Sequence, residues 1–179
     1  MSHRPPGFRL TIISGLAVLL ALLSACIPAD APGTSGTSGA SGGGRAALII
    51  VDAQRAVQQI CVELGGAQIT GQELIRLAGL PVTLDERNAM GALVCAIDGQ
   101  GCAFPAEDCL CQCRGLGECA YWASFVRTPP GAWTYAALGL SAQEVQPGDL
   151  YAWVWLPSAS ANAEVLGWLP DSEVESICP

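Results

Sequence analysis

The nine cysteines in this chain of 179 residues constrain its fold more than any other feature. Eight of them follow residue 60, at Cys61, Cys95, Cys102, Cys109, Cys111, Cys113, Cys119 and Cys178. Cysteines in such number either hold a soft metal ion through thiolates or pair as disulfides. The run from Cys109 to Cys113 has the form C-x-C-x-C and lacks the C-x-x-C gap of zinc knuckles. The spacing therefore favours disulfides, and no metal site is expected.

The first 26 residues have the pattern of an export signal followed by a lipidation site. Arg4 and Arg9 precede an apolar run, residues 10–23, whose length of about 14 residues is short of the roughly 20 that span a membrane. Residues 23–26, Leu-Ser-Ala-Cys, resemble the bacterial lipobox, in which the cysteine receives diacylglycerol and becomes the new N-terminus. We expect an extracytoplasmic protein anchored to the cell membrane by lipidated Cys26. The alternative, an uncleaved N-terminal anchor, leaves the rest of the chain on the same side.

Three segments follow from this pattern. The signal peptide occupies residues 1–25, and a lipidated cysteine with a flexible linker occupies residues 26–45. Residues 30–44 contain only Asp, Ala, Pro, Gly, Thr and Ser, a composition typical of a tether. The remainder, residues 46–179, is expected to form one domain, because its length suffices for a hydrophobic core.

The charged residues exclude several classes of function. All eight basic residues are arginines, and the single histidine, His3, lies in the signal. After cleavage of the signal, the chain keeps six arginines and sixteen acidic residues and is strongly acidic. Nucleic acid is therefore not an expected partner. Histidine-based nucleophile pairs, Schiff-base lysines and phosphate-binding lysines are absent from the mature sequence. We therefore expect a binding protein without a cofactor of its own rather than an enzyme. Carboxylates such as Glu107, Asp108 and Asp149 remain as acid catalysts, but no pair of them has a distinctive spacing.

Hydrophobic periodicity predicts an α+β fold that is mostly β. Strands are expected over residues 46–51, 57–64, 92–97, 120–127 and 150–155. One short helix begins after Thr70, with Glu73 completing a capping box, and ends near Gly79 and Pro81. Turns are expected at residues 129–131 and, as type II, at residues 147–149. The expected architecture is small antiparallel or mixed sheets, one short helix and a disulfide-stapled loop.

The cysteines are expected to fasten this architecture. Outside the cytoplasm, the eight cysteines that remain beside Cys26 can form up to four disulfides, with roughly 100 possible pairings. Cys61 and Cys95 fall on expected strands, whereas residues 101–118 form a loop poor in apolar side chains. We expect disulfides to fix this loop against neighbouring strands and a long-range bridge to hold the tail at Cys178.

The aromatic residues of the mature chain all follow residue 100. Alternation over residues 150–155 places Tyr151, Trp153 and Trp155 on one face, either as a platform for a flat ligand or as core, with Trp155 the most buried. There are two further aromatic pairs, Tyr121 with Trp122 and Trp133 with Tyr135. The domain thus has more aromatic residues than a core of its size requires, and we expect some of them to line a binding site. The candidate ligand-binding residues are Tyr121, Trp122, Trp133, Tyr135, Tyr151 and Trp153.

Three short motifs share their order and spacing with a known family. These are Ile97-Asp98-Gly99, Tyr121-Trp122 with Phe125, and Gly148-Asp149 followed by Trp153. Residues 46–156 resemble the transcobalamin-like C-terminal domain, the β-domain of the vitamin B12 carriers transcobalamin and intrinsic factor, which also recurs in bacterial lipoproteins. In the carriers this domain covers one face of a corrinoid, and a helical barrel holds the other face. The present sequence has no such barrel, and its cysteine-rich insert and its tail to Cys178 depart from the carrier pattern.

These observations predict a lipid-anchored binding module. Its ligand would be a corrinoid or another small flat molecule, delivered to an uptake system through a membrane transporter subunit. The alternative is a surface module without a small ligand, which contacts a protein or glycan through the loop of residues 102–119.

Overall fold

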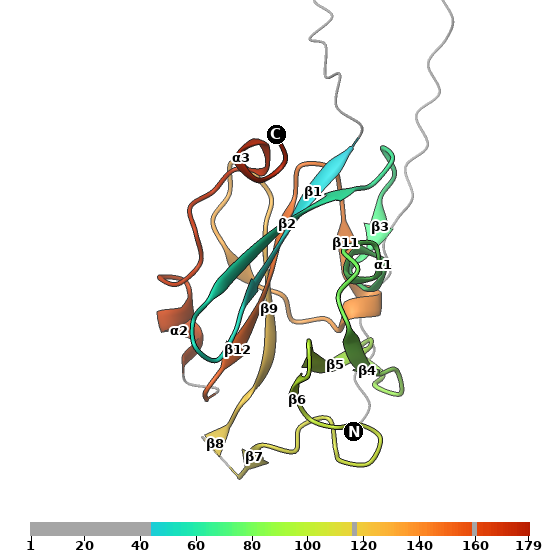
Figure 1. Ribbon diagram of the computed structural model, residues 1–179, viewed down its shortest axis with the longest axis vertical. Helices are drawn as coiled ribbons and strands as arrows, with labels where there is room; N and C mark the ends of the chain where they lie inside the picture. Colours follow the sequence, from blue (N-terminus) through green and yellow to red (C-terminus); the bar gives the residue numbers. More distant parts are fainter. Residues whose placement is uncertain (1–43, 116–117, 159–160) are drawn as a thin grey trace, which may run out of the picture. The chain divides into compact units, whose positions relative to one another are not determined.

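The computed structural model describes residues 44–115, 118–158 and 161–179 (Figure 1). The predicted signal peptide, Cys26 and nearly all of the linker lie outside the described residues. Within these residues, no helix is both long and apolar enough to cross a membrane. The described residues belong to one compact unit.

A five-stranded mixed sheet forms the centre of the domain. Its strand order is β10-β9-β12-β1-β2. The central strands β1 (Arg45–Val51) and β12 (Leu150–Leu156) run parallel, with Ala47 opposite Leu150. The other pairings are antiparallel and involve β2 (Val57–Glu63), β9 (Tyr121–Arg127) and β10 (Thr134–Tyr135). The sheet confirms the predicted strands at both ends of the domain.

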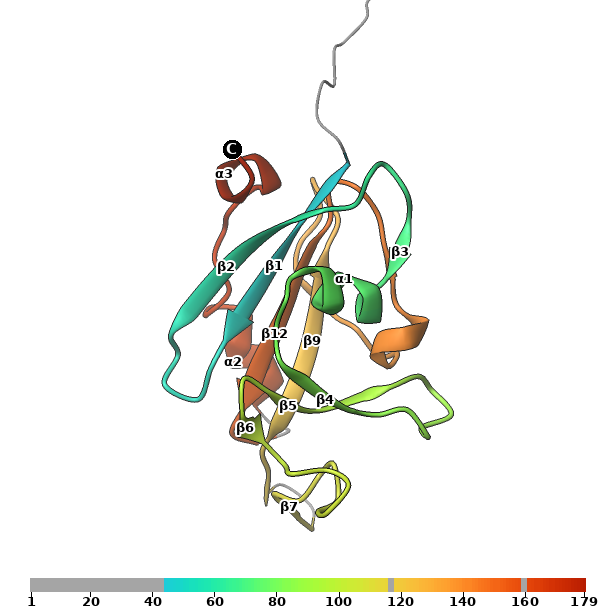
Figure 2. The same cartoon turned by 45° about the vertical axis from the view of Figure 1, so that its right-hand side comes forward.

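Both faces of the central strands are covered, which explains why β12 is buried along its whole length. One face carries Tyr151, Trp153 and Trp155 and packs against helix α1 (Gly71–Leu77) and strand β5 (Leu93–Ile97). The opposite face, with Leu150 and Val154, packs against the C-terminal segment. Figure 2 shows α1, β4 (Val82–Asp85) and β5 in front of the sheet. Figure 1 shows the short helices α2 (Asn162–Val165) and α3 (Val174–Ile177) on its other side.

The layer in front of the sheet consists of α1 and short strands. Helix α1 (Gly71–Leu77) begins as predicted, because Thr70 Oγ1 accepts a hydrogen bond from the Glu73 amide at 3.2 Å. The reciprocal half of the predicted capping box is replaced, since the Glu73 carboxylate pairs with Arg76. The short strands of this layer are β3 (Ile69–Thr70), β4 (Val82–Asp85), β5 (Leu93–Ile97), β6 (Gln100–Gly101) and β11 (Glu144–Val145).

Elements not anticipated from the sequence are all short. A single 3-10 turn, η1 (Leu140–Ala142), precedes β11, and two one-turn helices, α2 (Asn162–Val165) and α3 (Val174–Ile177), form the C-terminal segment. The fold class remains as predicted, because strands dominate and α1 is the longest described helix. The predicted type II turn also forms: Gly148 has a φ of 93°, and the Asp149 amide donates to the Gln146 oxygen at 3.1 Å.

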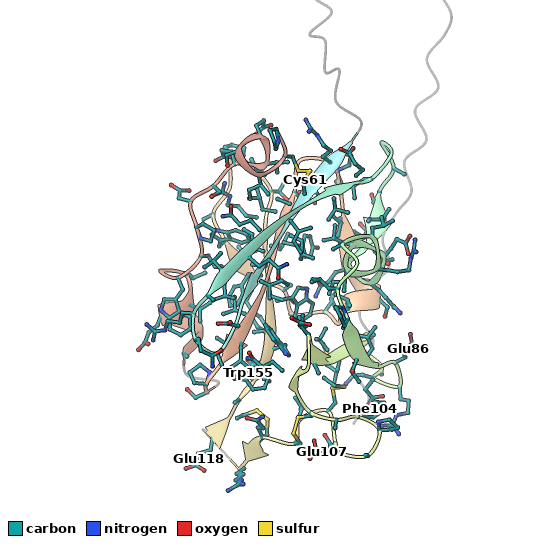
Figure 3. The ribbon with its side chains drawn as sticks, viewed as in Figure 1. Cys61, Glu86, Phe104, Glu107, Glu118 and Trp155 are labelled. Carbon is teal, nitrogen blue, oxygen red and sulfur yellow. A yellow bond between two sulfur atoms is a disulfide. The ribbon has the colours of Figure 1, made fainter. Side chains whose placement is uncertain are left out.

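All eight cysteines of the domain pair as disulfides. Cys61 is joined to Cys178, which confirms the long-range bridge to the tail. The other bridges are Cys95–Cys109, Cys102–Cys111 and Cys113–Cys119. The last of these closes the hairpin of β7 (Cys113–Arg114) and β8 (Glu118–Cys119). Figure 3 shows Cys61 at one end of the domain and Glu107 and Glu118 at the other, in the loop that the remaining bridges fasten.

Candidate functional site

Two crossing segments and the edge of β9 form a groove in front of the sheet. The Gly139 amide donates to the Met90 oxygen, and the Leu140 amide donates to the Ala92 oxygen, both at 2.8 Å. A Cβ on Gly139 would lie 2.3 Å from the carbonyl carbon of Gly91, so this crossing requires glycine. Residues 88–94 and 135–139 are thereby held beside residues 121–124, and together they line the groove.

The lining of this aromatic groove is mostly apolar, and several of its side chains are open to solvent. Trp122 and Trp153 are buried, with 5% and 4% of their surfaces exposed. Around them lie large exposed side chains, namely Met90, Leu110 and Leu138. None of the described residues that line the groove is charged. Its volume is about 150 Å³, below the roughly 300–1,000 Å³ of pockets that enclose a drug-sized ligand.

Two disulfides position Leu110 in this groove. Cys109 is bonded to Cys95 on β5, and Cys111 is bonded to Cys102. Leu110 stands between these two anchored cysteines and is 40% exposed. Because the backbone is fixed on both sides of Leu110, this residue has little freedom to turn its side chain away from water. The bridges therefore do more than fasten the loop, because they also present an apolar side chain to the groove.

One buried polar atom in the groove lining has no partner. Among the described residues, Trp153 Nε1 is buried without a hydrogen bond. Ser124 lies directly across from Trp153 on β9 and accepts a hydrogen bond from Gln143 Nε2 at 2.8 Å. An unpaired buried donor costs free energy, which a ligand acceptor can recover.

Four of the six predicted ligand-binding residues line the groove, namely Tyr121, Trp122, Tyr135 and Trp153. Of these, only Trp122 and Trp153 belong to the cluster in front of the sheet. Strand alternation places the Tyr121 side chain on the opposite face of the sheet, beside the C-terminal segment. Tyr135 lies on that opposite face as well, where it packs edge-to-face on Phe125, with ring centroids 5.7 Å apart, and remains half exposed.

Tyr151 and Trp133 lie elsewhere. Tyr151 is 3% exposed and donates a hydrogen bond from its hydroxyl to the Glu144 oxygen at 2.8 Å. Burial, together with the nearby charges of Asp149 and Glu144, raises the pKa of Tyr151 to about 12. Trp133 packs behind the sheet near the guanidinium of Arg127, 5.6 Å from the centre of its ring. The interpretation of the β12 aromatic row as a ligand platform is therefore wrong for Tyr151, whose ring is core. The expectation that Trp155 is the most buried of the row is also wrong, because its exposed fraction of 9% is the largest of the three.

Sequence reasoning missed Met90, Leu110 and Leu138. Each is an isolated apolar residue in a loop, where periodicity carries no information. The only local signal for a fixed side chain was the position of Leu110 between two cysteines, because two cysteines that each form a disulfide hold the residue between them.

The carboxylates considered for catalysis are engaged in local turns. Glu107 accepts from the Ala103 amide, and Asp108 accepts from the Leu110 amide, at 2.8 and 2.9 Å. Asp149 accepts from Thr128 Oγ1 and from the Gln146 amide, at 2.7 and 2.8 Å. Across the described parts of the chain, no three metal-binding side chains of His, Cys, Asp or Glu come together.

Comparison with known proteins yields only distant structural likenesses. No protein-family model matches the sequence, and no curated protein matches it significantly. A crystal structure titled "putative metal binding protein", from Ruminococcus gnavus, superposes with a TM-score of 0.46 at 12% sequence identity. The superposition covers 63% of this chain and 96% of the other.

Proposed function

We propose that this protein is an extracytoplasmic, membrane-anchored binding protein whose aromatic groove takes part of a flat, mainly apolar small molecule. The observation that carries the proposal is the group of exposed Met90, Leu110 and Leu138 around buried Trp122. Such side chains gain free energy when a ligand removes them from water, at about 25 cal/mol per Å². Their convergence in a hollow without charged groups favours an uncharged ligand surface.

The small volume of the groove bears on the kind of ligand. A hollow of about 150 Å³ cannot enclose a drug-sized molecule, so the ligand would lie partly outside it. A corrinoid held by one edge or face fits this description, and the sequence resemblance makes it the first ligand to test. The acceptor that Trp153 Nε1 lacks would come from a carbonyl or amide oxygen on such a ligand.

The exposed remainder of the ligand would be accessible to a partner. We place the protein beside a membrane transporter subunit, to which it would deliver the ligand. The lipid on Cys26 would hold the domain at the membrane, since two acyl chains give stable anchoring.

Titration of the purified protein with cobalamin and with cobinamide tests this function. The expected result is a shift of the corrinoid visible spectrum together with quenching of tryptophan fluorescence. L138Q should weaken binding about tenfold, the equivalent of 1.4 kcal/mol, because it removes apolar contact at the groove. L166Q is the matched control, since Leu166 is also exposed, at 45%, but lines a different hollow.

Two results would decide against the proposal. If neither corrinoid binds, the corrinoid version fails, and a panel of uncharged aromatic dyes with the same L138Q comparison tests the broader version. If L138Q and L166Q weaken binding equally, the ligand site is not this groove.

A protein partner is the second candidate function. It is favoured by the loop of residues 102–119, where three disulfides fasten a surface with exposed Leu110. The test is crosslinking on intact cells, with a crosslinker at this loop that does not react with cysteine. If this candidate is correct, crosslinking recovers a specific protein, and L110Q should abolish the recovery.

A further inference from the structure

Trp122 also lines a second hollow, which differs from the aromatic groove in its chemistry. This hairpin cavity lies between the β1–β2 hairpin and the β5–β6 turn and has a volume of about 320 Å³. Its apolar lining includes Ile50, Ile97 and Trp122, all of them buried. Its polar lining consists of Asp52, Gln58, Asp98 and Gln100. No described residue of the lining is basic.

Gln100 supplies a hydrogen-bond donor that the described residues leave unused. Its Nε2 atom is buried and has no partner among them. The amide orientation is determined by Oε1, which accepts from the Ala53 amide at 3.3 Å. The main-chain oxygen of Gln100 accepts from Trp122 Nε1 at 2.8 Å, so the residue is held at both ends. The free donor is therefore a fixed feature of the cavity and calls for an acceptor.

The two carboxylates of the lining are held on tight turns. Asp52 Oδ1 accepts from the amides of Gln54 and Ala56, both at 2.8 Å, which fixes the carboxylate at the hairpin. Asp98 has a φ of 49° in the turn before Gln100 and is exposed. Carboxylates accept hydrogen bonds strongly, and without a cation in the lining they favour ligand groups that donate.

The class of ligand follows from these requirements. An ammonium ion would serve the carboxylates but has no acceptor for Gln100 Nε2. A carboxylate or phosphate would accept from Nε2 but is repelled by two negative charges. A hydroxyl group both accepts and donates, and neighbouring hydroxyls can serve both kinds of group at once. The apolar side chains would pack against the C–H face of a ring that carries such hydroxyls.

We propose that the hairpin cavity binds a neutral polyhydroxylated ring, that is, a saccharide unit. Gln100 Nε2 donates to one ligand hydroxyl, and Asp52 and Asp98 accept from others. The cavity volume suits a monosaccharide or one end of a longer glycan. This site is separate from the aromatic groove and does not depend on the ligand proposed there.

The test uses the full-length, isotope-labelled protein in a detergent without a sugar head group. The probes are the methyl glycosides of glucose, galactose and mannose, and N-acetylglucosamine, with benzylamine and benzoate as charged comparisons. Binding is followed by the indole N–H resonance of Trp122, which reports on its bond to Gln100. At least one saccharide should shift this resonance and leave those of Trp133 and Trp168 unchanged.

Five variants locate the site. Q100E replaces the unused donor with an acceptor, and D98N weakens an acceptor at an exposed position. Each should weaken saccharide binding about tenfold. The matched controls are Q112E and E118Q, which make equivalent changes at exposed positions away from the cavity and should bind as the wild type does. L138Q should also bind normally, which separates this site from the groove.

Several outcomes would overturn the inference. One is that no saccharide of the panel shifts the Trp122 resonance. Another is that Q100E and D98N both bind as tightly as their controls while their near-ultraviolet circular dichroism remains native. Tighter binding of benzylamine than of every saccharide would assign the cavity to organic cations instead.

Discussion

The indole nitrogen of Trp122 donates a hydrogen bond to the main-chain oxygen of Gln100 at 2.8 Å. This bond links β9 to β6, and the same ring packs edge-to-face on Trp155, with centroids 5.5 Å apart. Trp122 lines both the aromatic groove and the hairpin cavity. Any change in its position therefore alters both candidate sites.

W122F should reduce stability and weaken both kinds of binding. The substitution removes the bond to Gln100 and leaves space beside Trp155, with an expected loss of about 2 kcal/mol in the free energy of unfolding. Urea denaturation at neutral pH measures this loss. W168F is the control, because Trp168 is only partly buried and lines neither hollow. Equal losses in the two variants would contradict a special role for Trp122.

Replacing Cys61 and Cys178 by serine should destabilise the domain more than replacing Cys113 and Cys119. The first bridge spans 117 residues and the second spans 6. Chain entropy assigns about 5 kcal/mol to the long bridge and about 2 kcal/mol to the short one. Urea denaturation compares the two double variants. Limited proteolysis should also cut near α3 first when the long bridge is missing, and a native cleavage pattern would contradict this.

The carboxylates beside Arg127 should contribute to the stability of the fold, because the guanidinium of Arg127 is buried. Arg127 has a side chain that is 5% exposed and pairs with Asp171 at 2.8 Å and Glu173 at 2.9 Å. D171A/E173A should cost about 3 kcal/mol in stability, since it leaves a buried charge without counterions. Adding R127M to that variant should restore most of the loss, as measured by urea denaturation. If the triple variant is the least stable, the buried charge is not the cause.

Alkaline pH should destabilise the domain through Tyr151. Its pKa is raised from 10.0 to about 12 by burial and by Asp149 and Glu144. The folded protein thus retains a proton that the unfolded chain loses above pH 10. The contribution of Tyr151 to the free energy of unfolding is therefore complete below pH 10 and is lost as the pH rises toward about 12. Y151F should flatten the fall of the unfolding free energy over this interval. An unchanged pH profile in Y151F would contradict the assignment.

The strands and turns were predictable because their signals are local. Alternation assigned Tyr151, Trp153 and Trp155 to one face of β12, and the structure confirms it. The function of that face was not predictable from β12 alone. It depends on Leu74 of α1 and Val94 of β5, which cover the row and make it core.

The aromatic groove shows the same limit. Trp122 and Trp153 could be nominated from the sequence, but Met90, Leu110 and Leu138 could not. Their meeting depends on the crossing of Gly91 and Gly139 and on the bridges at Cys109 and Cys111. These contacts join residues from separate loops, and no short-range pattern encodes them.

By itself, the sequence determined the strand periodicity, the start of α1, the Gly148 turn and the even number of cysteines in the domain. These depend on backbone preferences and side-chain alternation over a few residues. Only the tertiary structure decided which cysteines pair, which aromatic rings are core and where apolar side chains meet at the surface. The physical reason is that burial and pairing are set by contacts between segments distant in the chain, whose energies are gained only once the whole domain has packed.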